Sequence, residues 1–227
     1  MREAINGNKA IPLRRSYAKY FLRAIRRNYP DSYASIAEAT ERNYQAISVD
    51  TQFSFRSANP LDRRLDFCAC FLALIKALDD RGEQFDVIRN VSLEVITDFV
   101  SPKNRFQRMM KRLPAKLVGT WVWEAFVKSL SARVGKNDNK DGFIATIITD
   151  KEDTYGLGYG VDIIECGICK LFNKHNFGKY APILCEVDKL TTGFAGLEMI
   201  RSGTIANGAA RCDFRYKKLD SQAHDEP

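Results

Sequence analysis

The sequence predicts an α+β protein, in which an N-terminal helical region precedes an antiparallel sheet with helices packed on it. Through residues 1–134, apolar side chains recur at helical spacing. The polar, glycine-containing stretch RVGKNDNKDG at residues 133–142 is the clearest break in the chain. Beyond it, short runs rich in β-branched residues alternate with helix-like segments. Such a sequence favours one sheet covered by helices.

The expected organisation has three parts. Residues 1–134 form the helical region, residues 143–218 form the α+β portion that packs with it as one compact domain, and 219–227 form a disordered polar tail. A chain of 227 residues, 45% of them hydrophobic, can bury a core without disulfides or a structural metal. No apolar run approaches the roughly 20 residues of a membrane span, and the N-terminus lacks a secretory signal. We therefore expect a cytoplasmic protein with reduced cysteines.

Six helices are predicted in the helical region. They cover residues 13–28, 31–46, 61–78, 85–99, a segment starting at Ser101-Pro102, and 115–130. Asp31 is the expected cap of the second, and the fourth is ambiguous between helix and strand, with helix favoured. Pro114 should end or kink the fifth. The sixth is apolar enough to be buried, so core packing of Trp121 and Trp123 is favoured over a membrane belt.

The second part alternates strands and helices in the order β-β-α-α-β-β. Strands are predicted at residues 143–150, 157–166, 197–206 and 210–218, and helices at 167–176 and 181–196. Asn207-Gly208 is a strong signal for a hairpin turn between the last two strands.

The formal net charge of +7 allows a nucleic-acid or membrane-surface function. Much of the excess lies in residues 14–27 and 103–116, where apolar stripes accompany the basic residues. Solvated helix faces explain this pattern better, so we expect neither nucleic acid nor membrane as a partner. A basic pocket would suit a small carboxylate substrate instead. The helical excess also suggests a homodimer.

Three cysteines and a carboxylate are expected to converge in the second part. Cys166 ends a predicted strand, while Cys185 and Asp188, three residues apart, share one face of a predicted helix. Alternation along the last strand puts Cys212 on one face and Arg215 on the other.

Three interpretations of these cysteines remain open. They are small apolar core residues, or they are nucleophilic groups assisted by the carboxylate and a cation. The third interpretation is a zinc site, in which Cys166, Cys169, Cys185 and Cys212 supply four ligands. With His175 and His224 as the only histidines, a Cys-His pair is not favoured.

The segment from Cys166 to Tyr216 resembles the L-2-amino-thiazoline-4-carboxylic acid hydrolase family. The similarity lies in DIIECGICKLF, PILCEVD and IRSGTIANGAARCDFRY. It implies a hydrolase that opens a cyclic amidine-thioether ring with water, on a route to L-cysteine through a carbamoyl-cysteine. The ending G-x-x-x-C-D-F is also similar to vinyl reductase ligand-binding domains, which implies a non-catalytic small-ligand-binding module as the alternative.

Within the hydrolase hypothesis, Cys185 is the expected nucleophile, with Cys166 as the second choice, and Asp188 orients or activates the attacking group. A substrate carboxylate would be held by Arg215 or Arg201. The remaining candidates are Cys212 among the catalytic residues, and Thr204 and Glu186 among the substrate-binding residues. No cofactor and no metal are expected, and a zinc hydrolase using the same cysteines is the alternative.

Overall fold

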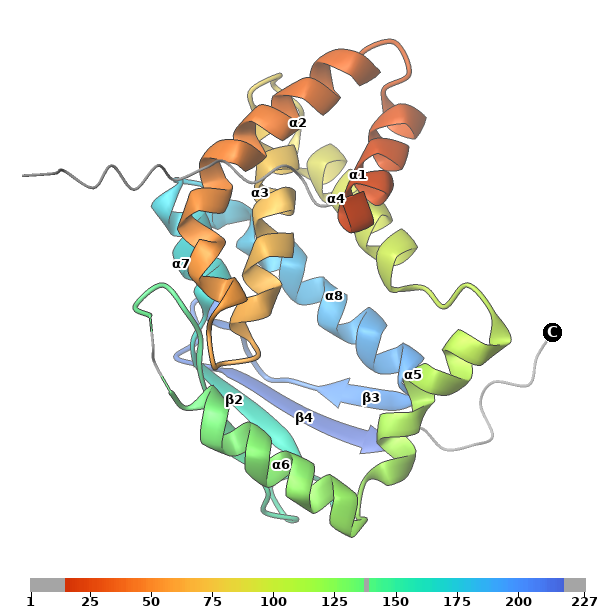
Figure 1. The fold of residues 1–227 in the computed structure, drawn as a ribbon, viewed down its shortest axis with the longest axis vertical. Coiled ribbons are helices and arrows are strands. Elements are labelled where there is room, and N and C mark those ends of the chain that lie inside the picture. Colours follow the sequence, from red (N-terminus) through yellow and green to blue (C-terminus); the bar gives the residue numbers. More distant parts are fainter. Residues whose placement is uncertain (1–14, 137–138, 219–227) are drawn as a thin grey trace, which may run out of the picture.

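A computed structural model describes residues 15–136 and 139–218 and confirms the α+β class. Helices gather in one part of the molecule and a four-stranded antiparallel sheet lies beside them (Figure 1). The predicted tail at 219–227 and the start of the first predicted helix lie outside the described residues.

The described part of the helical region contains six α-helices, and one of them is almost fully buried. Its helices are α1 (Arg15–Asn28), α2 (Tyr33–Ser48), α3 (Leu65–Asp79), α4 (Phe85–Val100), α5 (Arg105–Leu117) and α6 (Trp121–Val134). Most residues of α3 are buried, because its sequence is apolar on nearly every side and α2 and α4 pack against it. The segment that was ambiguous between helix and strand is the helix α4.

The predicted starts of three helices are wrong, and one of them is the sixth, which begins at Trp121 and not at residue 115. Ser32, not Asp31, is the N-cap of α2, and its side chain makes no capping hydrogen bond. Ser101 has extended backbone, the conformation favoured before proline, so α5 does not begin there. It begins after Asn104, whose side chain accepts a hydrogen bond from the Gln107 N–H at 2.8 Å.

The fifth helix also continues past Pro114 to Leu117. A proline inside a helix removes one backbone hydrogen bond. Because α5 is largely solvent-exposed, water can satisfy the carbonyl that this leaves without a donor.

The prediction that the sixth helix is buried is wrong. Trp121 is 80% exposed, and Val127 and Val134 are the only buried residues of α6. Trp123 is half-buried and packs edge-on against the Tyr159 ring with centroids 5.2 Å apart. No helix within the described ranges is long and apolar enough to cross a membrane.

The sheet has the strand order β1-β2-β4-β3, with every neighbouring pair antiparallel. The strands are β1 (Ile144–Ile148), β2 (Gly160–Glu165), β3 (Leu197–Ile200) and β4 (Cys212–Lys218). Between β2 and β3 the chain forms α7 (Gly167–Lys174) and α8 (Ala181–Phe194). Ile163 pairs with Cys212, and both are buried, so this face of the sheet belongs to the core.

The last two strands pair, but not through a two-residue turn. β3 ends at Ile200, and residues 201–211 form a loop that contains the short 3₁₀ helix Ile205–Asn207. Gly208 ends that helix with φ 86°, a conformation that glycine adopts readily. The Asp213 carboxylate accepts hydrogen bonds from the Ser202 and Gly203 N–H groups, which holds the loop in this shape.

Two buried polar residues join the helical region to the sheet. The Asn59 amide donates to the carbonyls of Val134 at 3.1 Å and Phe143 at 2.9 Å. The Asp62 carboxylate accepts from the Phe143 N–H at 2.8 Å. Together they fix the end of α6 and the chain just before β1 against the start of α3.

Candidate active site

A cavity of about 390 Å³ lies among α1, α3, α4, α7 and α8. Its wall is mostly apolar and is formed by Tyr17, Phe67, Cys68, Phe71, Ile96, Phe99, Val100, Ile168, Leu184 and Val187. The polar residues that line it are Arg63, Arg64, Asp188 and Thr191. An apolar cavity with a few polar groups is the usual form of a small-molecule site.

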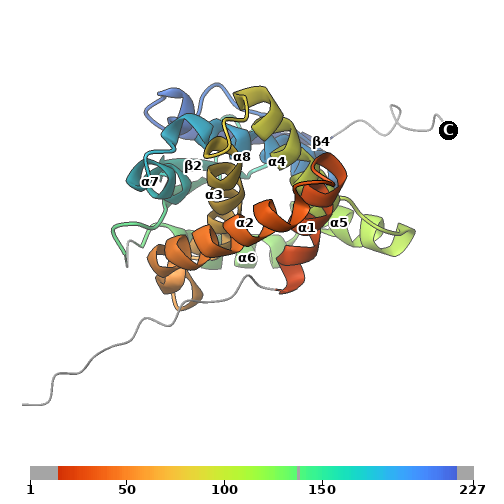
Figure 2. The ribbon, with the colours of Figure 1, turned by 90° about the horizontal axis from the view of Figure 1, so that it is seen from above.

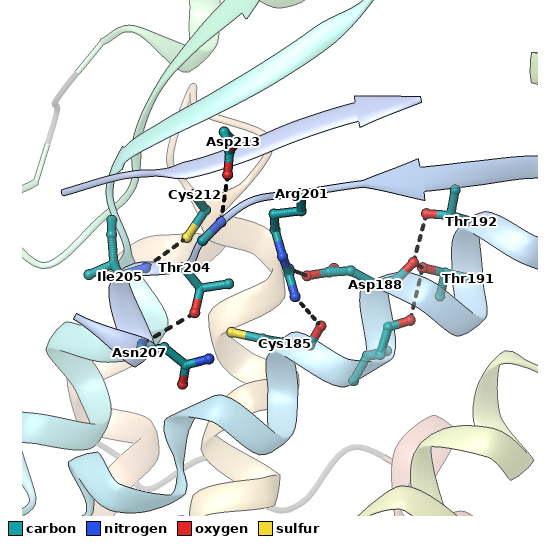
Figure 3. A network of polar contacts seen from close by, with 12 residues as sticks. Cys185, Asp188, Thr191, Thr192, Arg201, Thr204, Ile205, Asn207, Cys212 and Asp213 are labelled. Atoms are coloured by element: carbon teal, nitrogen blue, oxygen red, sulfur yellow. Dashed lines mark hydrogen bonds and ion pairs between the residues drawn. The ribbon is translucent and has the colours of Figure 1, made fainter. Parts of the chain in front are cut away.

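Asp188 connects this cavity to the polar network shown in Figure 3. Arg201, from the loop after β3, donates to its carboxylate at 3.3 Å and to the Cys185 carbonyl at 3.2 Å. The Arg201 side chain is only 11% exposed, and its guanidinium lies 5.1 Å from the centroid of the Phe214 ring. Burial raises the pKa of Asp188, while the charges of Arg64 and Arg201 act to lower it. The net result is a carboxyl that holds its proton more strongly than an exposed aspartate does.

Arg64 lines the cavity, and the sequence analysis did not single it out. No carboxylate of the described residues lies within ion-pair distance of Arg64. The charge of Arg64 acts against the burial that raises the pKa of Asp188 and of Tyr216. An unpaired guanidinium at an apolar cavity can receive a ligand carboxylate. The signal available in the sequence was the pair Arg63-Arg64 directly before the most apolar helix of the chain.

Cys166 occupies the N-cap position of α7 and is buried. The pKa of Cys166 is lowered, first by a hydrogen bond with the Cys169 thiol, with burial acting against it. The N–H groups of Cys169 and Ile168 lower it further. A thiolate is stabilised at a helix N-terminus because these N–H groups have no partner within the helix. The pKa of the partner thiol Cys169 is raised by the same contact.

The other two predicted site cysteines are harder to ionise. Burial and the charges of Asp188 and Cys166 raise the pKa of Cys185 to about 12. Burial also raises the pKa of Cys212, whose sulfur accepts the Ile205 N–H at 3.2 Å (Figure 3). The structure thus brings Cys166, Cys185, Cys212 and Asp188 within electrostatic range of one another, as the sequence predicted.

Three predicted binding residues are engaged elsewhere. Glu186 forms a two-point ion pair with Arg89 of α4, at 2.8 and 2.5 Å. Arg215 lies on the sheet face opposite Cys212, where its guanidinium donates to Asp162 at 2.8 Å.

The third such residue, Thr204, caps the 3₁₀ helix by accepting the Asn207 N–H at 3.2 Å. Its side chain is therefore already occupied by the backbone of its own loop. Of the predicted cations, Arg201 alone reaches Asp188.

Residues 15–136 and 139–218 contain no group of three or more His, Cys, Asp and Glu side chains placed to hold a metal ion. The zinc alternative therefore finds no ligand set in this part of the chain. All six cysteines are free thiols.

Comparison with known proteins places these features in a family. Searches of the curated proteins and of the solved structures gave no significant match. The family model for L-2-amino-thiazoline-4-carboxylic acid hydrolase matches residues 63–216, well over half of the chain. The match extends from the cysteine motifs back to the Arg63-Arg64 pair at the cavity. The resemblance inferred from the sequence is confirmed, and the chain belongs to the L-2-amino-thiazoline-4-carboxylic acid hydrolase family.

Proposed function

We propose that this protein hydrolyses a small cyclic amidine that carries a carboxylate, of the L-2-amino-thiazoline-4-carboxylate type, and that Asp188 and Cys166 assist the reaction. The family name supports hydrolysis. The observation that carries the assignment to this site is the carboxyl of Asp188, whose pKa is raised at the polar end of an apolar cavity.

Arg64 is the proposed partner of the substrate carboxylate. It borders the cavity and has no ion pair with a described carboxylate, whereas Arg201 is already paired with Asp188. A guanidinium binds a carboxylate through two parallel hydrogen bonds, which would fix the orientation of the ring. The ring itself would lie against apolar side chains such as Phe67.

Cys166 is the proposed nucleophile, in preference to Cys185. Its thiolate is stabilised by Cys169 and by the N-terminus of α7, whereas the pKa of Cys185 is about 12. Attack on the amidine carbon, in the tautomer whose ring nitrogen carries a hydrogen, would give a tetrahedral adduct. Protonated Asp188 would donate its proton to the ring nitrogen as the C–N bond breaks and the exocyclic C=N bond forms again. Asp188 would then accept one proton from water as the water oxygen replaces the Cys166 sulfur on that carbon. The second proton of the water would pass to the exocyclic nitrogen, which becomes the carbamoyl NH₂ group. One water is added across the C–N bond, and the thiolate is restored.

The cavity has room for more than this ring. Its volume of about 390 Å³ falls within the roughly 300–1,000 Å³ of sites that hold drug-sized ligands. Several aromatic side chains line it, including Phe99, which is 37% exposed. We therefore expect substrates with an apolar substituent to bind more tightly than the unsubstituted ring acid.

The test is turnover of L-2-amino-thiazoline-4-carboxylate by purified variants, with product detected by mass spectrometry. Asp188→Asn and Cys166→Ser should each lower kcat by about 100-fold or more, the usual contribution of a positioned acid–base group or nucleophile. The controls change the same residue types elsewhere. Asp80→Asn removes an exposed carboxylate that pairs with Lys76, and Cys70→Ser changes a buried thiol that contacts the Asp66 carbonyl.

Wild-type levels of turnover in both site variants would contradict the proposed roles. If the wild type binds the ring acid, measured by calorimetry, but never converts it, the non-catalytic ligand-binding module is the correct function. Such a module would use the same cavity without chemistry.

A further inference from the structure

The helix α5 exposes an apolar stripe that nothing in the described structure covers. Phe106, Met109, Met110 and Leu113 recur at helical spacing, and their exposed fractions are 65%, 54%, 46% and 42%. In a globular protein such a stripe normally faces the core. Here the helix projects from the edge of the molecule (Figure 2), so the stripe faces solvent.

The rest of α5 is strongly basic. Its sequence RFQRMMKRLPAKL contains five lysines and arginines and no acidic residue. Arg105, Arg108, Arg112 and Lys116 are exposed, and Lys111 is half-buried, where it donates to the Val100 carbonyl. An exposed helix with one apolar and one cationic face is typical of segments that lie in the interface of an anionic membrane.

The chain that follows extends the apolar surface. Three residues separate α5 from α6, and α6 opens with Trp121, 80% exposed, and the exposed Val122. Phe126, one turn further along, is also exposed. Tryptophan is enriched at membrane–water interfaces, where its ring lies at the level of the lipid headgroups.

We propose that α5 and the start of α6 bind the surface of an anionic lipid bilayer. Phe106, Met109, Met110 and Leu113 would enter the boundary between headgroups and acyl chains, and the guanidinium groups would contact lipid phosphates. A second copy of the chain is a poorer occupant of this surface. Two α5 helices packed through their apolar stripes would bring the basic residues of each against those of the other, without acidic residues in α5 to offset the repulsion.

The test is flotation of the full-length protein with vesicles of phosphatidylcholine alone or mixed with phosphatidylglycerol. We expect binding to the anionic vesicles and not to the neutral ones, weakened by added salt because the attraction is partly screened. Arg105→Gln with Arg108→Gln should reduce the apparent affinity about tenfold or more, since each basic residue near an anionic surface contributes about 1 kcal/mol. Phe106→Ser with Met110→Ser should reduce it as well.

The matched control is Lys19→Gln with Arg26→Gln in α1. It removes the same charge from another exposed basic helix, whose apolar residues Phe21, Ala24 and Ile25 are buried in the core. This variant should retain vesicle binding, and circular dichroism checks that every variant is folded. Equal binding to neutral vesicles, no binding at all, or a dimer that Phe106→Ser with Met110→Ser dissociates would each overturn the proposal.

Discussion

Asp188 is the residue on which the proposed chemistry depends, because its side chain lines the cavity and its carboxyl lies 3.3 Å from the Arg201 guanidinium. Burial is the largest influence and raises its pKa, and Arg64 and Arg201 only partly offset it. A carboxyl that retains its proton above the usual range can act as a general acid.

The same shift predicts a pH dependence of stability. Folding raises the pKa of Asp188, so the folded state binds its proton more tightly than the unfolded chain does. The free energy of unfolding should therefore contain a contribution that is present at low pH and is lost as pH rises through the raised pKa. Asp188→Asn, which is neutral at every pH, should remove this loss. Urea unfolding of wild type and variant at a series of pH values measures it.

Asp80→Asn is the control, because that carboxylate is exposed and should leave the loss in place. If Asp188→Asn destabilises the protein by the same amount at every pH, the pKa of Asp188 is not raised in the folded state.

At the residue scale, the sequence singled out Cys166, Cys185 and Cys212 and ranked Cys185 above Cys166 as the candidate nucleophile. The structure favours the reverse order for these two thiols. The difference comes from position: Cys166 caps α7, whereas Cys185 lies within α8 beside a carboxylate. Arg64 was missed because only the fold brings it to the same cavity as Asp188, more than 120 positions away in the chain.

At the scale of elements, the junction between the helical region and the sheet depends on few polar contacts. Asn59 is fully buried and is hydrogen-bonded to two carbonyls, one at the end of α6 and one just before β1. Buried carbonyls without a donor are costly, so this residue is a point where the junction can be weakened.

Asn59→Ala should lower the free energy of unfolding by about 2–4 kcal/mol, because two buried carbonyls lose their donor. Asn28→Ala is the matched control: its amide contacts the Ala24 carbonyl and Glu94 at the surface, so its loss should cost less than about 1 kcal/mol. Urea unfolding measures both. A loss for Asn59→Ala no larger than that for Asn28→Ala would show that the junction does not depend on these contacts.

The periodicity of the sequence predicted the position of most helices and strands. It did not predict burial, loop length or helix starts, because these depend on contacts with other parts of the chain. The apolar residues of α6 predicted burial, yet Trp121 lies at the surface, because hydrophobic spacing does not say whether another element covers it. Asn207-Gly208 favoured a tight hairpin turn. Instead, the Asp213 carboxylate accepts hydrogen bonds from the Ser202 and Gly203 N–H groups and stabilises a longer loop. The predicted start of α5 at Ser101-Pro102 was wrong, because the side chain of Asn104, three residues after Ser101, caps this helix by accepting the Gln107 N–H.

At the scale of the whole molecule, both halves of the chain line the cavity. The helical region supplies Arg64 and most of the apolar wall, and the α+β portion supplies Asp188, Thr191 and a few apolar side chains. Arg201 is connected to the cavity through its ion pair with Asp188. The family match from residue 63 to 216 spans both contributions. Of the residues that the sequence motifs singled out, Asp188 lines this cavity, and the fold brings Arg64 to it from the first half of the chain.

The most direct test of the proposed chemistry is the alkylation rate of each cysteine by iodoacetamide as a function of pH, mapped by mass spectrometry. We expect Cys166 to react with an apparent pKa below that of an ordinary thiol, and L-2-amino-thiazoline-4-carboxylate to protect it. Cys185 should react only at high pH, since its pKa is raised to about 12. Faster alkylation of Cys185 than of Cys166, or no protection of Cys166 by the ring acid, would contradict the assignment of Cys166 as the nucleophile.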